Sequence, residues 1–213
     1  MTGLKAVLFD LDGVLCDSRA PITACINHAL VLHGREAVPA DELLPFIGPP
    51  LYETFFGFVG DAAGAAACVH AYQEAYQQRS LVETTICPGV VEALAALAGR
   101  YRLAVATSKP ALAAQPILEA LGLASWFECI AGPALDGDVE TKDVTFGRAL
   151  AELALPGAEA VLVGDRLYDI VAAHAHGALA IGATWGVGTV AELEAAGADL
   201  LVDSPAQLVA VLT

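Results

Sequence analysis

The chain has 213 residues, of which 56% are hydrophobic, and 25 acidic against 10 basic side chains give it a formal net charge of −15. This length suits one domain of ordinary size or a core with a smaller insert, and the apolar content is ample for a sizeable core. The acidity argues against nucleic acid as a general partner, because no basic stripe is available to meet phosphate groups.

No membrane span or secretion signal is indicated. The apolar stretches are interrupted well short of the roughly 18 residues that a span needs, and Lys5 leads directly into a strand pattern instead of a signal-type apolar region. The five cysteines are scattered and lack Cys-x-x-Cys spacing, which is typical of reduced thiols and does not support a zinc site. We therefore expect a soluble, cytoplasmic protein.

The first predicted strand is the apolar run 6–9, and two acids, Asp10 and Asp12, follow it directly. Side chains two residues apart in an extended chain point the same way, so both should project from the carboxyl end of the strand, where open α/β sheets bind ligands. Two carboxylates this close repel each other unless a cation or a proton lies between them. Mg2+ fits because it prefers oxygen ligands. An EF-hand calcium loop is disfavoured, since Pro21 stands where that loop needs a glutamate.

Residues 16–85 lack clear strand patterns and are predicted to form a helical domain inserted into a core of residues 1–15 and 86–213. The expected helices are 20–32 with Ser18 as N-cap, a short helix capped by Asp41 and ending at Phe46, and 62 to about 80 with Asp61 as N-cap.

After Pro88, strands and helices alternate along the chain. Strands are predicted over 103–106, 128–131, 160–163, 179–181 and 200–202, and helices over 90–97, 111–121, 144–153, 170–176, 190–196 and from Ser204 to the end. Continuous apolar strands that alternate with helices indicate a parallel sheet covered on both faces. The predicted fold class is α/β: a Rossmann-like, doubly wound parallel sheet core with an inserted α-helical cap domain.

Polar residues also stand at three later positions along this edge. The strand at 103–106 is followed by Thr107-Ser108-Lys109, Lys142 precedes the helix expected at 144, and a later strand ends in the stretch 164–169 with Asp165 and Asp169. In a parallel sheet these ends share one edge, so residues far apart in sequence can meet in one crevice. Together they supply the carboxylates, hydroxyls and ammonium groups that phosphoryl transfer requires.

These motifs resemble those of the haloacid dehalogenase superfamily, and within it the phosphoglycolate-phosphatase-like branch with a helical cap. The matching stretches are DLDGVLCDS at 10–18, TSK at 107–109, Lys142 and GDRLYD at 164–169, and FIGPPLYETF and TWGVG are also similar. The resemblance implies a Mg2+-dependent phosphatase that hydrolyses small-molecule phosphate monoesters through an aspartyl-phosphate intermediate. It also implies that the helical domain closes over the site as a cap.

The resemblance implies roles for the four acids. Asp10 would be the nucleophile, and Asp12 would be the general acid and then the general base. Mg2+ would be held by Asp10, the backbone carbonyl of Asp12, and Asp165. Asp169 would support the metal shell, directly or through water.

The resemblance also implies the phosphate contacts. Thr107 and the backbone of Ser108 would bind phosphoryl oxygens, and Lys142 would balance charge on the nucleophile and the phosphoryl group. Contacts between the substrate and three other cations are left open: Lys109, Arg19 and Arg166.

Other activities remain as alternatives. A phosphomutase of the β-phosphoglucomutase type carries Glu-Asp where this chain has Gly164-Asp165, a dehalogenase would lack Asp12, and phosphonatase chemistry uses a cap lysine that residues 16–85 do not contain. A catalytically silent binding protein would be expected to have lost one of the key acids, and all are present. Phosphoglycolate, pyrophosphate, 5'-nucleotides and sugar phosphates stay open as substrates, and a monomer and a homodimer as assemblies.

Overall fold

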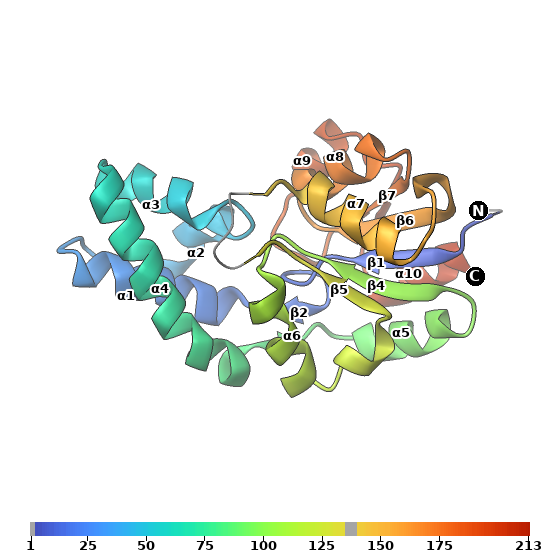
Figure 1. The fold of residues 1–213 in the computed structure, drawn as a ribbon, viewed down its shortest axis with the longest axis horizontal. Helices are drawn as coiled ribbons and strands as arrows, with labels where there is room; N and C mark the ends of the chain where they lie inside the picture. The colour runs from blue at the N-terminus through green and yellow to red at the C-terminus, as the bar shows by residue number, and fades with distance from the viewer. Residues whose placement is uncertain (1–2, 135–139) are drawn as a thin grey trace. The chain divides into compact units, whose positions relative to one another are not determined.

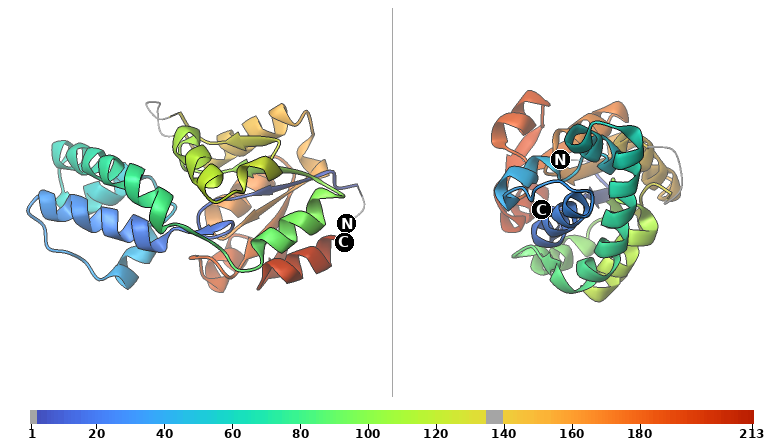
Figure 2. Two further views of the ribbon diagram at one scale, coloured as in Figure 1. Left: turned by 90° about the horizontal axis from the view of Figure 1, so that it is seen from below. Right: turned by 90° about the vertical axis from the view of Figure 1, so that its left-hand side faces the viewer.

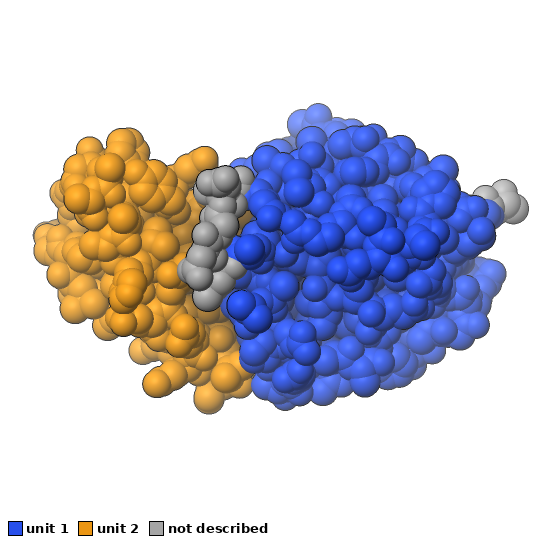
Figure 3. All heavy atoms as spheres, in the orientation of Figure 1, with its two compact units in different colours: residues 1–17, 86–213 blue, residues 18–85 orange. Residues whose placement is uncertain are grey.

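The computed structural model describes residues 3–134 and 140–213 (Figure 1). The chain forms two compact units, one of residues 1–17 and 86–213 and the other of residues 18–85 (Figure 3). The first unit is a sheet with helices, and the second is almost wholly helical.

The first unit contains a six-stranded parallel sheet. Its strands are β1 (Ala6–Phe9), β4 (Arg102–Ala106), β5 (Cys129–Ala131), β6 (Ala160–Gly164), β7 (Leu179–Ala183) and β8 (Leu200–Val202), in the spatial order β5-β4-β1-β6-β7-β8. Counted along the chain, this is the 3-2-1-4-5-6 order of a doubly wound sheet, so the predicted fold class is confirmed. Strand β1 lies between β4 and β6, and the direction in which strands are added to the sheet reverses at this point.

Both faces of this sheet are apolar and covered. On β1, Val7 and Phe9 belong to one buried cluster and Ala6 and Leu8 to the other, because alternate side chains of a strand point to opposite faces. The helices are α5 (Val90–Ala98), α6 (Ala111–Ala120) and α10 (Pro205–Leu212) on the first face, and α7 (Lys142–Glu152), α8 (Leu167–Ala175) and α9 (Val190–Ala195) on the second (Figures 1 and 2). Polar chemistry is left to the ends of the strands.

Two helices begin earlier than the hydrophobic pattern predicted. Helix α7 starts at Lys142 and not near residue 144, and α8 starts at Leu167 and not at Ile170. Their first turns carry polar side chains that are nevertheless buried, since Lys142 is 6% exposed and Asp169 is 1% exposed. A hydrophobic pattern does not register a buried charge, and for this reason it placed both helix starts too late.

The second unit packs helix α4 (Ala62–Glu83) against α1 (Arg19–Leu32) and α3 (Leu51–Val59). A short helix, α2 (Ala40–Leu43), and a 3-10 turn over Leu44–Phe46 lie between α1 and α3. Phe55 of α3 is fully buried and meets the ring of Tyr72 edge to face, with 6.2 Å between the ring centroids. This unit is held by ordinary apolar and aromatic packing.

The capping predictions for these helices had mixed outcomes. Asp61 caps α4 as expected, because its carboxylate accepts a hydrogen bond of 2.8 Å from the Gly64 N–H. The prediction for Asp41 was wrong: α2 already begins at Ala40 after Pro39, so Asp41 lies within its first turn. Ser18 occupies the N-cap position of α1, but its side chain makes no capping hydrogen bond there.

Outside the main sheet, β2 (Cys16–Asp17) and β3 (Thr85–Ile86) pair where the chain leaves and rejoins the first unit. All five cysteines are free thiols. Over the described ranges, every helix is too short or too polar to cross a membrane.

Candidate active site

Three neighbouring strands end in polar residues at the same edge of the sheet. Strand β1 pairs in parallel register with both β4 and β6 up to its last residue, Phe9. Asp10, Thr107 and Asp165 are the residues that follow these three strands. The topology therefore brings the predicted nucleophile, hydroxyl and metal ligand to adjacent positions, as the sequence analysis expected of a parallel sheet.

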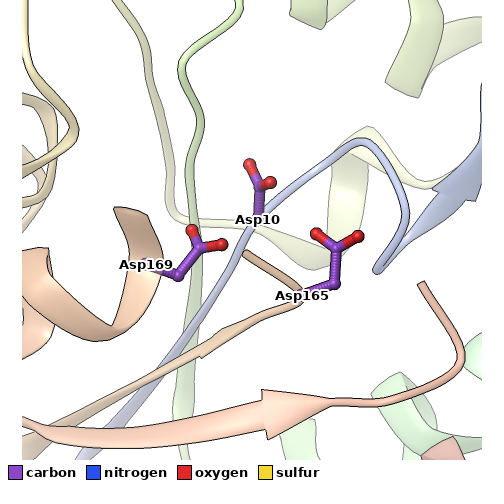
Figure 4. A group of neighbouring side chains, drawn as sticks. All are labelled: Asp10, Asp165 and Asp169. Atoms are coloured by element: carbon purple, nitrogen blue, oxygen red, sulfur yellow. The ribbon is translucent and has the colours of Figure 1, made fainter. Parts of the chain in front are cut away.

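Asp10, Asp165 and Asp169 form a buried group of carboxylates, with ligand oxygens that all lie within 4.8 Å of one another (Figure 4). Burial, opposed by Lys142 and reinforced by Asp169, raises the pKa of Asp10 to about 6. Burial and the charges of Asp10 and Asp169 raise the pKa of Asp165 to about 8. Each shift arises because like charges are crowded in a dry environment, which a bound cation would relieve.

Lys142 faces two of these carboxylates from the first turn of α7. Its Nζ atom lies 2.6 Å from Asp10 Oδ1 and 2.8 Å from Asp169 Oδ1, and its side chain is 4% exposed. Burial by itself lowers the pKa of Lys142, but Asp10 and Asp169 outweigh it and raise that pKa above its usual range. The ammonium group is therefore permanently charged beside Asp10.

Asp12 forms an ion pair with a different lysine, Lys109. Lys109 Nζ lies 2.9 Å from Asp12 Oδ2, and the two side chains are 9% and 15% exposed. The Lys109 N–H donates a hydrogen bond of 3.1 Å to Thr107 Oγ1. The structure thus places Lys109, whose contact with the substrate the sequence left open, beside Asp12 at the site.

A loop after β7 encloses Asp165. The Val187 N–H donates a hydrogen bond of 2.6 Å to Asp165 Oδ2. A Cβ atom at Gly186 or Gly13 would overlap the Asp165 side chain, and one at Gly188 would overlap its carbonyl oxygen. Gly186 and Gly188 belong to the TWGVG stretch at 184–188, which matched the family pattern without an assigned role. The two glycines of this stretch are the sequence signal for a close approach of backbone to a functional side chain.

Arg166 and Glu192 support the start of α8. Arg166 Nε lies 2.9 Å from Glu192 Oε1, and the same oxygen accepts a hydrogen bond of 2.9 Å from the Leu167 N–H. Asp169 accepts a bond of 3.1 Å from the Arg166 N–H. These bonds satisfy backbone N–H groups at the start of α8 that have no acceptor within the helix. Sequence reasoning missed Glu192, because nothing local to it indicates that it would meet the residues after β6.

Other side chains that could carry chemistry lie elsewhere or serve packing. Burial raises the pKa of the Cys16 thiol well above its usual range, which disfavours a nucleophilic role. His174 pairs with Asp199 at 3.1 Å, and His176 lies 2.9 Å from the Asp143 carbonyl oxygen. Arg19 opens α1 in the helical unit.

The residues present fit a divalent cation. Four carboxylates, those of Asp10, Asp12, Asp165 and Asp169, are accompanied by two ammonium groups in the described part of the chain. With all four acids ionised, two negative charges are left for a cation to balance. Asp12 Oδ1 and Asp165 Oδ1 are buried and have no hydrogen-bond partner among the described residues. Carboxylate oxygens are also the donors that hard divalent cations prefer.

A family model described as haloacid dehalogenase-like hydrolase matches residues 7–183 of this chain. The chain belongs to this family. The match includes the four aspartates and both lysines of the site, so the resemblance drawn from the four motifs is confirmed.

Individual relatives are similar over almost their full length. The 5'-nucleotidase of Pseudomonas aeruginosa is 36% identical over 191 residues, which cover 89% of this chain and 86% of that protein. The plasmid phosphoglycolate phosphatase of Cupriavidus necator is 33% identical over 98% of this chain and 93% of its own length. The crystal structure of a predicted phosphatase from Clostridium acetobutylicum superposes with a TM-score of 0.93 at 33% identity, covering 98% of both chains.

Proposed function

We propose that this protein is a Mg2+-dependent phosphatase that hydrolyses small-molecule phosphate monoesters through an aspartyl-phosphate on Asp10. One observation carries the proposal: Asp10 is buried at the switch point of the sheet, with a permanently charged Lys142 2.6 Å away and two further buried carboxylates beside it. The names of the relatives, a nucleotidase and a phosphoglycolate phosphatase, support the same reaction class.

In the first half of the proposed reaction, a carboxylate oxygen of Asp10 attacks phosphorus as the bond from phosphorus to the ester oxygen breaks. Asp12, two residues along the same segment, gives its proton to the departing oxygen, which leaves as an alcohol. Lys142 and the Thr107 hydroxyl stabilise the charge on the phosphoryl oxygens while the group moves. Asp10 then carries the phosphoryl group as an acyl phosphate.

In the second half, water attacks the phosphorus of the aspartyl-phosphate and the bond to the Asp10 oxygen breaks. Asp12, now ionised, takes the proton from that water. Inorganic phosphate is released, and both acids return to their starting states. The Ser108 backbone is proposed to hold a phosphoryl oxygen beside Thr107 through both halves.

Mg2+ is the cation that best suits this set of oxygen donors. We assign it to Asp10, the backbone carbonyl of Asp12, and Asp165, with Asp169 in support. When bound, it would neutralise charge on the phosphoryl group and on the acids around it.

The mutase alternative is disfavoured by packing. A Cβ atom at Gly164 would overlap the side chain of Asp169, so the glutamate that mutases of the β-phosphoglucomutase type carry before this aspartate does not fit here. The physiological substrate is left to experiment, among the esters 5'-nucleotides, phosphoglycolate and sugar phosphates, and the anhydride pyrophosphate. We propose that residues 18–85 act as the cap that selects it, in a cytoplasmic enzyme.

The decisive experiment is p-nitrophenyl phosphate hydrolysis by the wild type and by Asp10→Asn, each with Mg2+ or EDTA. We expect activity only in the wild type with Mg2+, because Asp10→Asn removes the nucleophile, a loss expected to exceed about 10³-fold by comparison with other nucleophile knockouts. The matched control is Asp41→Asn, an exposed acid in α2, which should keep full activity. Near-normal turnover of Asp10→Asn, with a normal circular dichroism spectrum, would refute the proposal.

A further inference from the structure

Two of the three lysines of this acidic chain lie at the sheet edge, and each is paired with a different acid of the first motif. Lys142 contacts Asp10 at 2.6 Å, and Lys109 contacts Asp12 at 2.9 Å. The Lys109 side chain is only 9% exposed. A lysine this well covered is almost never found without a partner of opposite charge. The cost of taking this ammonium out of water is offset by its pairing with Asp12.

The backbone of Lys109 is fixed from two sides. Its N–H donates to Thr107 Oγ1 at 3.1 Å, directly after β4. Gly132, which follows β5, approaches so closely that a Cβ atom there would overlap the Lys109 carbonyl oxygen. The Ala111 N–H donates to the Pro133 carbonyl at 3.2 Å, which ties the next turn to the same segment. Lys109 thus starts from a rigid strand end.

We propose that Lys109 is the positioning residue of Asp12: its ammonium holds the Asp12 carboxyl group in the orientation from which a proton passes to the leaving oxygen and later returns from water. The inference rests on the proposed function, and specifically on Asp12 as the acid and base. Without the ion pair, the Asp12 side chain turns away from the like charge of Asp10, and proton transfer loses its geometry. The two lysines then divide the work, with Lys142 serving the nucleophile and Lys109 serving the acid.

This role predicts a dependence on the leaving group that a merely structural residue would not show. An alkyl phosphate such as glycerol phosphate needs a proton on its departing oxygen, whereas 2,4-dinitrophenyl phosphate releases a stable anion. Because positioned proton transfer is typically worth about 10²–10⁴-fold, Lys109→Met should lower kcat/KM for the alkyl ester by about 10-fold or more. For the dinitrophenyl ester we expect kcat/KM to stay near the wild-type value, because this ratio reports only the first half of the reaction. Hydrolysis of the aspartyl-phosphate also uses Asp12, so kcat itself can fall for both esters.

The matched control is Lys5→Met. Lys5 also pairs with a carboxylate at 2.9 Å, that of Glu159, but its side chain is 57% exposed and it precedes β1 at the opposite end of the strand. Both esters should be turned over by this variant as by the wild type. Lys109→Arg keeps the charge and should recover part of the loss on the alkyl ester.

A double-mutant cycle shows whether Lys109 acts through Asp12. In an Asp12→Asn background, Lys109→Met should add no further loss on the alkyl ester, because the group that it positions is already gone. Additive losses of kcat/KM would overturn the inference, as would an equal loss of kcat/KM on both esters or no loss in Lys109→Met. Lys109→Gln is assayed in the same way, so that a folding defect of one variant does not decide the result.

The failure of this inference is distinguishable from failure of the proposed function. If the wild type hydrolyses neither ester, or Asp10→Asn is as active as the wild type, the proposed function itself is wrong. If the wild type is active and Asp10→Asn is not, the proposed function stands. If Lys109→Met then leaves the ratio of kcat/KM for the alkyl ester to kcat/KM for the dinitrophenyl ester unchanged, only the role of Lys109 is wrong.

Discussion

The sheet edge of the first unit and the helical unit of residues 18–85 are both well packed, but they bury different chemistry. The edge buries four charged side chains, Asp10, Lys142, Asp165 and Asp169. The polar side chains buried in the helical unit are all uncharged: Ser18, Thr23, Thr54, Ser80 and Thr84. Burying charged groups costs stability. The gathering of four of them at one edge therefore indicates that this edge is less stable than it could be and is suited to chemistry. Removing a buried charge at the sheet edge should therefore raise the stability of the metal-free protein, whereas removing a buried side chain of the helical unit should lower its stability.

The largest expected effect on metal binding is at Asp165. Asp165→Asn removes a proposed metal ligand, and because even residues that only support metal ligands contribute about 10–100-fold to metal affinity, we expect at least that loss for Mg2+ by calorimetric titration. Hydrolysis of p-nitrophenyl phosphate at low Mg2+ should fall in parallel. Wild-type Mg2+ affinity in this variant would place the metal elsewhere.

The same substitution should stabilise the metal-free protein, which is the reverse of its effect on metal binding. The folded pKa of Asp165 is about 8, against an ordinary value of 3.8. Between these values the folded state binds more protons than the unfolded state, so the unfolding free energy falls as pH rises from about 4 to about 8. In EDTA at pH 8, Asp165→Asn should melt several degrees above the wild type, since about 1 kcal/mol shifts Tm by about 2–4 °C at this chain length.

At pH 4 in EDTA the difference should be nearly gone, because wild-type Asp165 is then protonated in the folded state and about half protonated in the unfolded state. Added Mg2+ should raise the melting temperature of the wild type at pH 8 and leave that of the variant unchanged. A metal-free variant that melts below the wild type at pH 8 would contradict the charge crowding described for this edge.

In the helical unit, the largest effect on stability is expected at Phe55, which contributes only through packing. Phe55→Ala empties a fully buried position beside Tyr72 and should cost about 3–5 kcal/mol of unfolding free energy in urea. The control is Phe56→Ala, one residue along α3 and 46% exposed, which should stay within about 0.5 kcal/mol. Equal effects of the two substitutions would mean that this helix packs by another face.

The smallest expected effect separates two acids of the helical unit that look alike in sequence. Asp61→Ala removes the cap of α4 and should cost about 1 kcal/mol, a typical loss for an N-cap. Asp41→Ala should be near neutral, because Asp41 lies inside the first turn of α2 and caps nothing. Urea unfolding of both variants tests this, and a larger loss at Asp41 would restore the capping role that its sequence context suggested.

Several features of the fold could be predicted because they depend on short-range patterns. Apolar strands of four or five residues that alternate with helices are enough to indicate a parallel sheet, and the motif order along the chain is enough to indicate one active edge. The starts of α7 and α8 were misplaced, because Lys142 and Asp169 are polar residues that this fold buries. Glu192 was missed, and the TWGVG stretch with Gly186 and Gly188 was noted without a role, since their contacts with the residues after β6 are long-range.

By itself, the sequence determined the fold class, the family and the residues gathered at the edge, because these follow from hydrophobic period and from motifs within single segments. Only the tertiary structure decided which lysine serves which acid, since Lys109 and Lys142 reach Asp12 and Asp10 from separate segments after β4 and in α7. The crowding that raises the pKa of Asp165 likewise exists only once three distant aspartates share a dry site. Charge partnership depends on distance and burial, and neither is written in the local order of residues.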